Sequence, residues 1–374
     1  MEISNSNGEL SDISDNIETN LPHEIKLVKR DKYNFINSTI HCLTNNISFL
    51  KQVSGSQMRD NTYQIFFSFF LEISQLIMNN EEKEKENKNK ILDDLHLKFY
   101  NFIISDEYLF KNKSIHDPRI LIDYIYNLFL KIDKIDYDKS ISNILNVQKA
   151  ITDEKIKFYL FNSLSELNKY DSNYNYYKII LKKTINCSDN KCQKKSDLYK
   201  YFSILEFYLD YNEDKVYTLD YCFENFIKKE NKEEDYKCPI CSKKIKVKTE
   251  NLFFSLPNSL IILLYYGDGK SYQNYYYKFD EIIYFSKFHF ISKEYSNKKY
   301  FLSSLIVVKS PKDENKIFYT FCRKDMKSPF YVYNSEDIRG NIKNVNNKII
   351  KFKNEEFKKK RSFPIVLIYT ILED

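Results

Sequence analysis

The chain has 374 residues and a formal net charge of +6, from 58 basic and 52 acidic residues. Charges of both signs alternate along the sequence, and the one basic cluster, residues 358–361, is explained as well by a solvated turn. Nucleic-acid-binding proteins concentrate positive charge on one face or arm, so no nucleic-acid partner is expected. The 32 Tyr and 29 Phe are spread over the whole length with abundant Asn, Lys and Ile, a bias typical of AT-rich codons.

The sequence also argues against membrane insertion and secretion. No apolar run reaches the ~20 residues that cross a bilayer, and residues 1–20 are acidic and polar, unlike a secretory signal. The chain has seven cysteines, an odd number, and no export signal, so a framework of disulfide bonds is not expected. The expected location is the cytoplasm or the nucleus.

The first half of the chain is predicted to be helical after a disordered tail at residues 1–24. A first helix is expected to begin near Asn37 and Ser38, and a second, apolar on most sides, covers residues 63–78. The charged run 81–90 is predicted to be an exposed insertion before a third helix at residues 91–103. Asp117 followed by Pro118 is a start signal for a further helix.

After about residue 175, short apolar runs rich in β-branched and aromatic residues alternate with turns, which is typical of strands. They cover residues 177–181, 204–209, 260–266, 301–308, 330–333 and 365–371. Helices first and strands later predict an α+β fold.

Four of the seven cysteines occur as two pairs, Cys187 with Cys192 and Cys238 with Cys241. A tight turn between two cysteines directs both sulfurs at one point, and tetrahedral zinc takes four such ligands. Together the pairs predict one structural Zn²⁺ per chain. The alternative is four buried thiols, which reduced cysteines tolerate well.

The order of these segments resembles the ubiquitin-specific protease family. Residues 26–43, KLVKRDKYNFINSTIHCL, fit the family's opening box G-L-x-N-x-G-N-T-C-Y-x-N-S-x-L-Q-C-L at Leu27, Phe35, Asn37, Ser38, Ile40, Cys42 and Leu43. Residues 115–122 are similar to the family's Q-Q-D-A-x-E-F-L helix, 217–226 and 236–241 to its fingers, 256–264 to its L-P-x-x-L-I-I-x-L strand, and 366–369 to its closing strand.

The resemblance implies a papain-like α+β fold for residues 25–374. Residues 25–174 would form a mainly helical thumb, 175–255 the zinc-bearing β fingers, and 256–374 a mixed β palm. It also implies that the catalytic centre is degenerate. Asn34 stands where the family has its nucleophilic Cys, Ile317 replaces the general base His, and Lys29 replaces the oxyanion Asn, whereas Asn334 matches the third catalytic member.

A thiol protease needs a thiolate, an imidazole and an oxyanion donor, so the resemblance predicts a pseudoenzyme. The expected role is binding of ubiquitin or a ubiquitin-like protein, or scaffolding in a multiprotein complex. One alternative is an active deubiquitinase with Cys42 or Cys322 as a displaced nucleophile, although no His is expected beside either. The other is a ubiquitin-independent scaffold in a spliceosome-type complex, since the family contains a dead spliceosomal member.

Overall fold

The computed structural model describes residues 27, 34–46, 49–50, 53, 68–73, 85–105, 117–132, 179–186, 195–209, 216–230, 234–237, 241–247, 249–266, 276–288, 296–309, 316–323, 325–328, 330–334, 343–345 and 362–372. The predicted tail, residues 1–24, lies outside this set. None of the helices within the described ranges is long and apolar enough to cross a bilayer.

Two of the predicted helix starts are displaced. The first helix, α2 (Asn34–Thr44), begins three residues before Asn37, because the Asn37 side chain contacts His96 Nε2 at 3.0 Å instead of capping the helix. Helix α5 (Lys85–Ser105) begins inside the charged run that was predicted to be an insertion. Lys and Glu are good helix formers, so this run extends the amphipathic helix toward solvent.

The predicted start of α6 (Pro118–Ile132) is confirmed. Asp117 Oδ1 accepts a hydrogen bond from the backbone N–H of Arg119 at 2.9 Å, which is the geometry of an N-cap. The Leu121 amide donates to the Asp117 carbonyl and closes the first turn of the helix.

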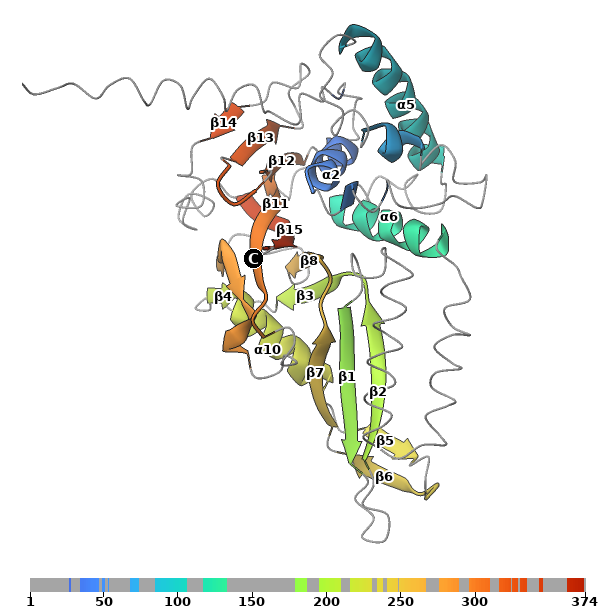
Figure 1. Cartoon of the computed structure of the whole chain (residues 1–374), viewed down its shortest axis with the longest axis vertical. Coiled ribbons are helices and arrows are strands. Elements are labelled where there is room, and N and C mark those ends of the chain that lie inside the picture. The colour runs from blue at the N-terminus through green and yellow to red at the C-terminus, as the bar shows by residue number, and fades with distance from the viewer. Residues whose placement is uncertain are drawn as a thin grey trace, which may run out of the picture.

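An eight-stranded sheet forms the centre of the molecule (Figure 1). Its order is β14 (Lys343–Val345), β13 (Phe330–Asn334), β12 (Ile317–Cys322), β11 (Lys299–Lys309), β15 (Ser362–Ile371), β8 (Ser259–Tyr266) and β3 (Leu205–Leu209), and β10 (Ile282–Tyr284) pairs with β11. Neighbours are antiparallel except for the parallel pair β3 and β8. β3, from the predicted fingers range, therefore belongs to this sheet.

A second group of strands extends away from the large sheet (Figure 1). It contains the sheet β2 (Lys195–Phe202), β1 (Ile179–Asn186), β7 (Thr249–Ser255) and the hairpin β5 (Glu234–Lys237), β6 (Lys244–Val247). Between the two groups lie α10 (Leu219–Glu230) and the pair β4 (Val216–Thr218), β9 (Tyr276–Lys278).

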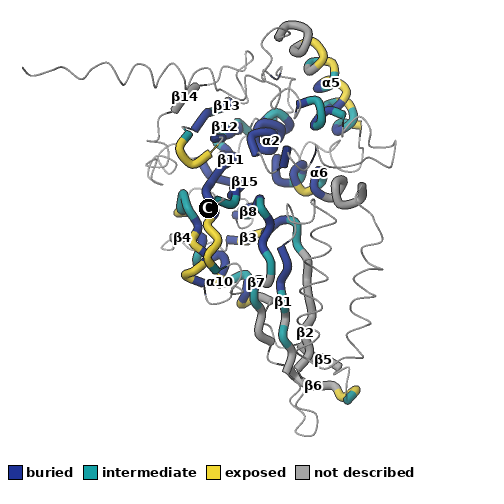
Figure 2. Tube along the Cα trace, viewed as in Figure 1, coloured by how far each residue is buried: buried dark blue, intermediate teal, exposed yellow. Residues whose placement is uncertain are grey.

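The core lies where α2 packs on the large sheet (Figure 2). The central strands β11 and β15 are buried along almost their whole length, as expected for strands covered on both faces. At the C-terminal end of α2, Asn46 Nδ2 donates to Ser259 Oγ at 2.6 Å and to Thr370 Oγ1 at 3.4 Å. Thr370 in turn bonds Ser303 Oγ at 2.9 Å, so a buried polar network joins the helix to β8, β15 and β11.

Candidate functional site

The site that the sequence predicts lies where α2 and β12 begin. Thr320 Oγ1 donates to the Ser38 carbonyl at 3.2 Å, and Cys322 Sγ contacts the His41 carbonyl at 3.4 Å. Both contacts advance along helix and strand in the same direction, so α2 and β12 run side by side with their first residues at the same end. Those first residues are Asn34 and Ile317, and both are half-buried.

Asn334 reaches the same end of the sheet by strand pairing. It is the last residue of β13 and pairs with Tyr319, two residues along β12 from Ile317. The structure thus brings three of the four predicted positions together, and Lys29 lies outside the described residues. The side chains at these positions are the amides of Asn34 and Asn334 and the sec-butyl group of Ile317. None of the three is a thiol or an imidazole.

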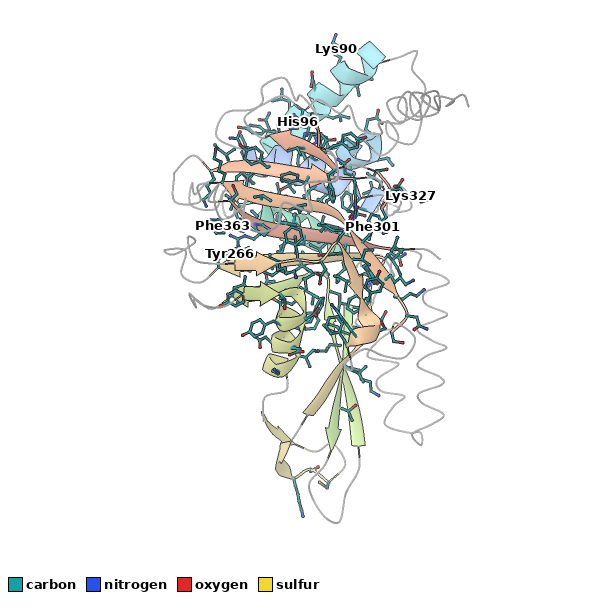
Figure 3. All side chains as sticks on the ribbon, turned by 90° about the vertical axis from the view of Figure 1, so that its left-hand side faces the viewer. Lys90, His96, Tyr266, Phe301, Lys327 and Phe363 are labelled. Atoms are coloured by element: carbon teal, nitrogen blue, oxygen red, sulfur yellow. The ribbon has the colours of Figure 1, made fainter. Side chains whose placement is uncertain are left out.

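The strand register assigns one end of the large sheet to this site. Ile317 pairs with Lys309, and Lys309 pairs with Ser362. In Figure 3, Phe363 and Tyr266 mark this end, whereas Phe301 and Lys327 mark the opposite one. The Asn46 network described above lies at the opposite end, so α2 spans the sheet from one end to the other.

The two cysteines considered as displaced nucleophiles are both sealed in the core. Cys42 and Cys322 are 0% exposed. Burial raises the pKa of the Cys42 thiol well above its ordinary value, and the nearby Cys322 raises it further, although a hydrogen bond from Ser304 opposes both effects. Burial likewise raises the pKa of Cys322. Thiols in such surroundings remain protonated and unreactive.

The two described histidines serve the packing of α2. His41 stacks on Tyr333 with ring centroids 3.9 Å apart, and His96 is fully buried against Asn37. His41 and Cys42 are adjacent in a helix, so their side chains diverge by about 100°. Neither ring is placed to activate a thiol at the start of α2.

A buried ion pair borders the site, and its cation was given no role by sequence reasoning. Arg119 donates through Nε to both Asp117 carboxylate oxygens at 3.0 Å, through Nη2 to Oδ2, and through Nη1 to the Leu264 carbonyl of β8. Its guanidinium carbon lies 4.5 Å from the centre of the Tyr265 ring. A signal was available in the sequence: an Arg two residues after a helix-capping Asp.

The positive charge of Lys316, just before the start of β12, also affects the Asp117 carboxyl. Burial raises the pKa of the Asp117 carboxyl. The charge and hydrogen bonds of Arg119, together with the charge of Lys316, lower this pKa by more than burial raises it. The net pKa of Asp117 is below its ordinary value. Lys316 immediately precedes Ile317, so the ion pair at the start of α6 lies within electrostatic reach of the start of β12.

Only Cys241 of the four predicted zinc ligands lies within the described residues. It is half-buried in the turn that joins β5 to β6, and the next residue, Ser242, has a φ of 58°. This left-handed backbone lets the chain reverse sharply, as a cysteine knuckle requires. The β5–β6 hairpin lies beside the end of β1 that leads to residue 187 (Figures 1 and 3). Cys187, Cys192 and Cys238 are outside the described ranges, so the zinc site stays a prediction.

No protein-family model matches the sequence, and no similarity to a curated protein is found. Solved structures of the SAGA DUB module are similar in fold. The module of Ubp8, Sgf11, Sus1 and Sgf73 bound to monoubiquitin matches with a TM-score of 0.56 at 13% identity, over 97% of this chain and 74% of that chain. The same module bound to ubiquitin aldehyde matches with a TM-score of 0.56 at 14% identity and the same coverages.

The yeast module with an Sgf73 mutant has a TM-score of 0.51 at 15% identity, over 93% of this chain and 68% of that one. Identities this low establish the fold alone. They confirm the α+β architecture predicted from the sequence, which is similar over nearly its whole length to that of Ubp8, a ubiquitin-specific protease.

Proposed function

We propose that this chain binds ubiquitin or a ubiquitin-like protein without cleaving it. The fold is similar to that of Ubp8, whose module has been solved with monoubiquitin and with ubiquitin aldehyde. The observation that carries the proposal is the composition of the end shared by α2 and β12, where Asn34 and Ile317 stand at the first positions of the two elements.

Loss of hydrolysis follows from what these positions lack. An amide does not attack a carbonyl as a thiolate does, and Ile317 can neither accept nor return a proton. Removing single members of a hydrolase triad costs ~10⁴ to ~10⁶ in rate. The burial of Cys42 and Cys322 argues against rescue by either thiol, because a substrate carbonyl cannot reach a fully covered sulfur.

Binding survives such losses more readily than catalysis does. A protein–protein interface of ordinary size distributes contacts over ~20–30 residues on each side. Two substitutions at the site of chemistry therefore remove a small part of it. Asp117 and Arg119 remain held together by their ion pair, and Arg119 is tied to β8 by its hydrogen bond to the Leu264 carbonyl.

Two measurements on the full chain test the proposal. Ubiquitin carrying a fluorogenic group at its C-terminus should be hydrolysed no faster than in buffer, and a ubiquitin vinyl sulfone should not label the chain. Immobilised ubiquitin should retain the chain, whereas ubiquitin with its apolar surface patch substituted should not. Labelling at Cys42 or Cys322 would overturn the non-catalytic part, and absence of retention at high micromolar ubiquitin would overturn the binding part.

The second candidate is a ubiquitin-independent scaffold. It is favoured by the similar solved structures, in which Ubp8 is held in a module with Sgf11, Sus1 and Sgf73. Stable co-purification of the chain with other proteins, combined with no retention on ubiquitin, would support this role.

A structural zinc belongs to the same proposal. The β5–β6 turn with Cys241 is a suitable half-site, and a metal there would tie the two hairpin ends of the fingers together. Four thiolates complete the tetrahedral shell, so this zinc would stabilise structure and leave no position for substrate. Metal analysis of the purified chain should give close to one zinc per molecule.

A further inference from the structure

Tyr208 is the most exposed large apolar side chain in the described part of the chain, at 56%. It lies on β3, the outermost strand in the order of the described sheet, where alternate residues face solvent. Tyrosines that keep this much surface in water are enriched where proteins bind partners.

The ring of Tyr208 is held in a defined orientation. Tyr208 pairs with Tyr265 in the parallel register of β3 and β8, and the two rings stack with centroids 4.9 Å apart and planes 12° apart. Glu206, on the same face of β3, accepts hydrogen bonds from Tyr208 Oη at 2.9 Å and from Tyr265 Oη at 3.4 Å. An exposed carboxylate therefore fixes both phenols at one edge of the stack.

The charges of this cluster do not cancel. The guanidinium of Arg119 lies over the Tyr265 ring, but it is already neutralised by the Asp117 carboxylate. Within the described residues, no cation forms an ion pair with Glu206, and its carboxylate accepts hydrogen bonds from the two tyrosine hydroxyls. The outer part of the cluster thus combines a negative carboxylate with an exposed aromatic ring.

We infer that Glu206 and Tyr208 form a binding site for an arginine side chain of a protein partner. A flat guanidinium can stack on an aromatic ring while it donates hydrogen bonds to a carboxylate at the ring edge, whereas a lysine ammonium stacks less well. One guanidinium, that of Arg119, already lies over the Tyr265 ring of the same cluster, with Asp117 as its carboxylate. The site adjoins the part of β8 that contacts Arg119, at the β3 edge of the sheet, where three strands separate β3 from β12.

Arginine binding at this cluster does not require that the chain bind ubiquitin. A small arginine ligand therefore tests this site independently of ubiquitin binding. The probe is the tripeptide acetyl-Gly-Arg-Gly-amide, with the citrulline peptide as a neutral control of the same shape. Saturation-transfer NMR on the full chain reports contact of the arginine side-chain protons with the protein. We expect saturable, millimolar binding of the arginine peptide with an upfield shift of its Cδ protons, and at least about fivefold weaker binding of the citrulline peptide.

Single variants identify the site. Glu206→Gln and Tyr208→Leu should each weaken arginine binding at least about fivefold, whereas Tyr208→Phe, which keeps the ring, should have the smaller effect. The matched control is Tyr284→Leu, since Tyr284 is 46% exposed but shares a surface hollow with Lys298 and Lys299, which repel a cation. No saturable binding of the arginine peptide, equal binding of the citrulline peptide, or unchanged binding to Glu206→Gln would overturn the inference. Loss of ubiquitin binding alone would leave it standing.

Discussion

Replacing Arg119 with Met tests whether the ion pair beside the candidate site holds helix α6 on the sheet. Methionine keeps an apolar stem of similar length, so most packing contacts of the side chain persist. What disappears is the cation that neutralises Asp117 and the donor to the Leu264 carbonyl. The Asp117 and Arg119 side chains are 14% and 10% exposed, so water cannot readily replace these contacts.

The expected cost is about 3–5 kcal/mol in the free energy of unfolding, the range for breaking a buried ion pair by removing one partner. The Leu264 carbonyl, left without its donor, accounts for about 1–3 kcal/mol of such a loss. Typical domains are stable by only 5–15 kcal/mol, so the variant should unfold at much lower urea concentration. Removing both charges, as Asp117→Asn with Arg119→Met, should recover part of the loss, because no unpaired carboxylate is then buried.

The pH dependence gives the sharper test because its sign is fixed. In the unaltered chain the pKa of Asp117 is lowered, so its contribution to stability is complete above the ordinary pKa of about 3.9 and is lost as the pH falls through the lower folded value. Without Arg119, burial dominates and should raise that pKa. Protonation then relieves the variant as the pH falls from about 7 toward about 4.5.

The measurement is urea unfolding followed by circular dichroism, since the chain has no Trp to report by fluorescence. The stability gap between the unaltered chain and Arg119→Met should be widest near neutral pH and should narrow on acidification. Taking the difference between the two proteins removes the effects of other titrating groups. A gap that is the same at both pH values, or a double variant as unstable as the single one, would refute the assignment of the loss to a buried, unpaired Asp117.

Three further predictions concern other parts of the chain. The double variant Asn34→Cys with Ile317→His should hydrolyse ubiquitin–fluorophore conjugates at most weakly, and adding Lys29→Asn should increase the rate of hydrolysis. Full activity of the double variant would show that Lys29 does not hinder catalysis. Cys238→Ser should lower bound zinc below one equivalent and increase proteolysis of the β5–β6 hairpin but not of α2; unchanged zinc content would contradict the proposed ligand set. Asn46→Ala should lower the free energy of unfolding by about 1–3 kcal/mol, because it leaves buried hydroxyls without their donor, and a loss below about 0.5 kcal/mol, the size of a neutral surface change, would contradict this.

The sequence was sufficient for six of the fifteen described strands and for one helix start, because these depend on local chemistry. Short β-branched and aromatic runs predicted six segments, and each overlaps a strand of the structure. The capping of α6 by Asp117 is likewise a contact within three residues. Such local signals need no knowledge of the rest of the chain.

The errors came where distant contacts decide the outcome. Asn37 is a good capping residue in isolation, yet in the structure its amide contacts His96, 59 residues away, and α2 begins earlier at Asn34. The charged residues that open α5 lack apolar positions, so their pattern alone predicts an insertion. They continue the helix outward from a core formed by residues such as Phe99 and Ile103.

The long-range polar contacts beside the candidate site could not be predicted for a similar reason. Arg119 bonds Asp117 locally, but it also contacts Leu264 and Tyr265, which are more than a hundred residues further along the chain. The cluster of Glu206, Tyr208 and Tyr265 depends on the parallel register between β3 and β8, and nothing within either segment indicates that the two strands are neighbours. In a chain with 32 Tyr, no single tyrosine stands out before the fold is known.

If the chain binds without cleaving, as proposed, the arrangement of the candidate site accounts for how the packing tolerates the change. The proposed catalytic positions at the starts of α2 and β12 contribute little to the core because Asn34 and Ile317 are only half-buried. The contacts that hold these elements together, from Thr320 to Ser38 and from Cys322 to His41, lie deeper and do not involve the first residues. Substitution at the first positions therefore leaves the packing of helix on sheet intact. The ion pair of Asp117 and Arg119 and the exposed cluster around Tyr208 both adjoin neighbouring residues of β8, Leu264 and Tyr265, and neither includes Asn34 or Ile317.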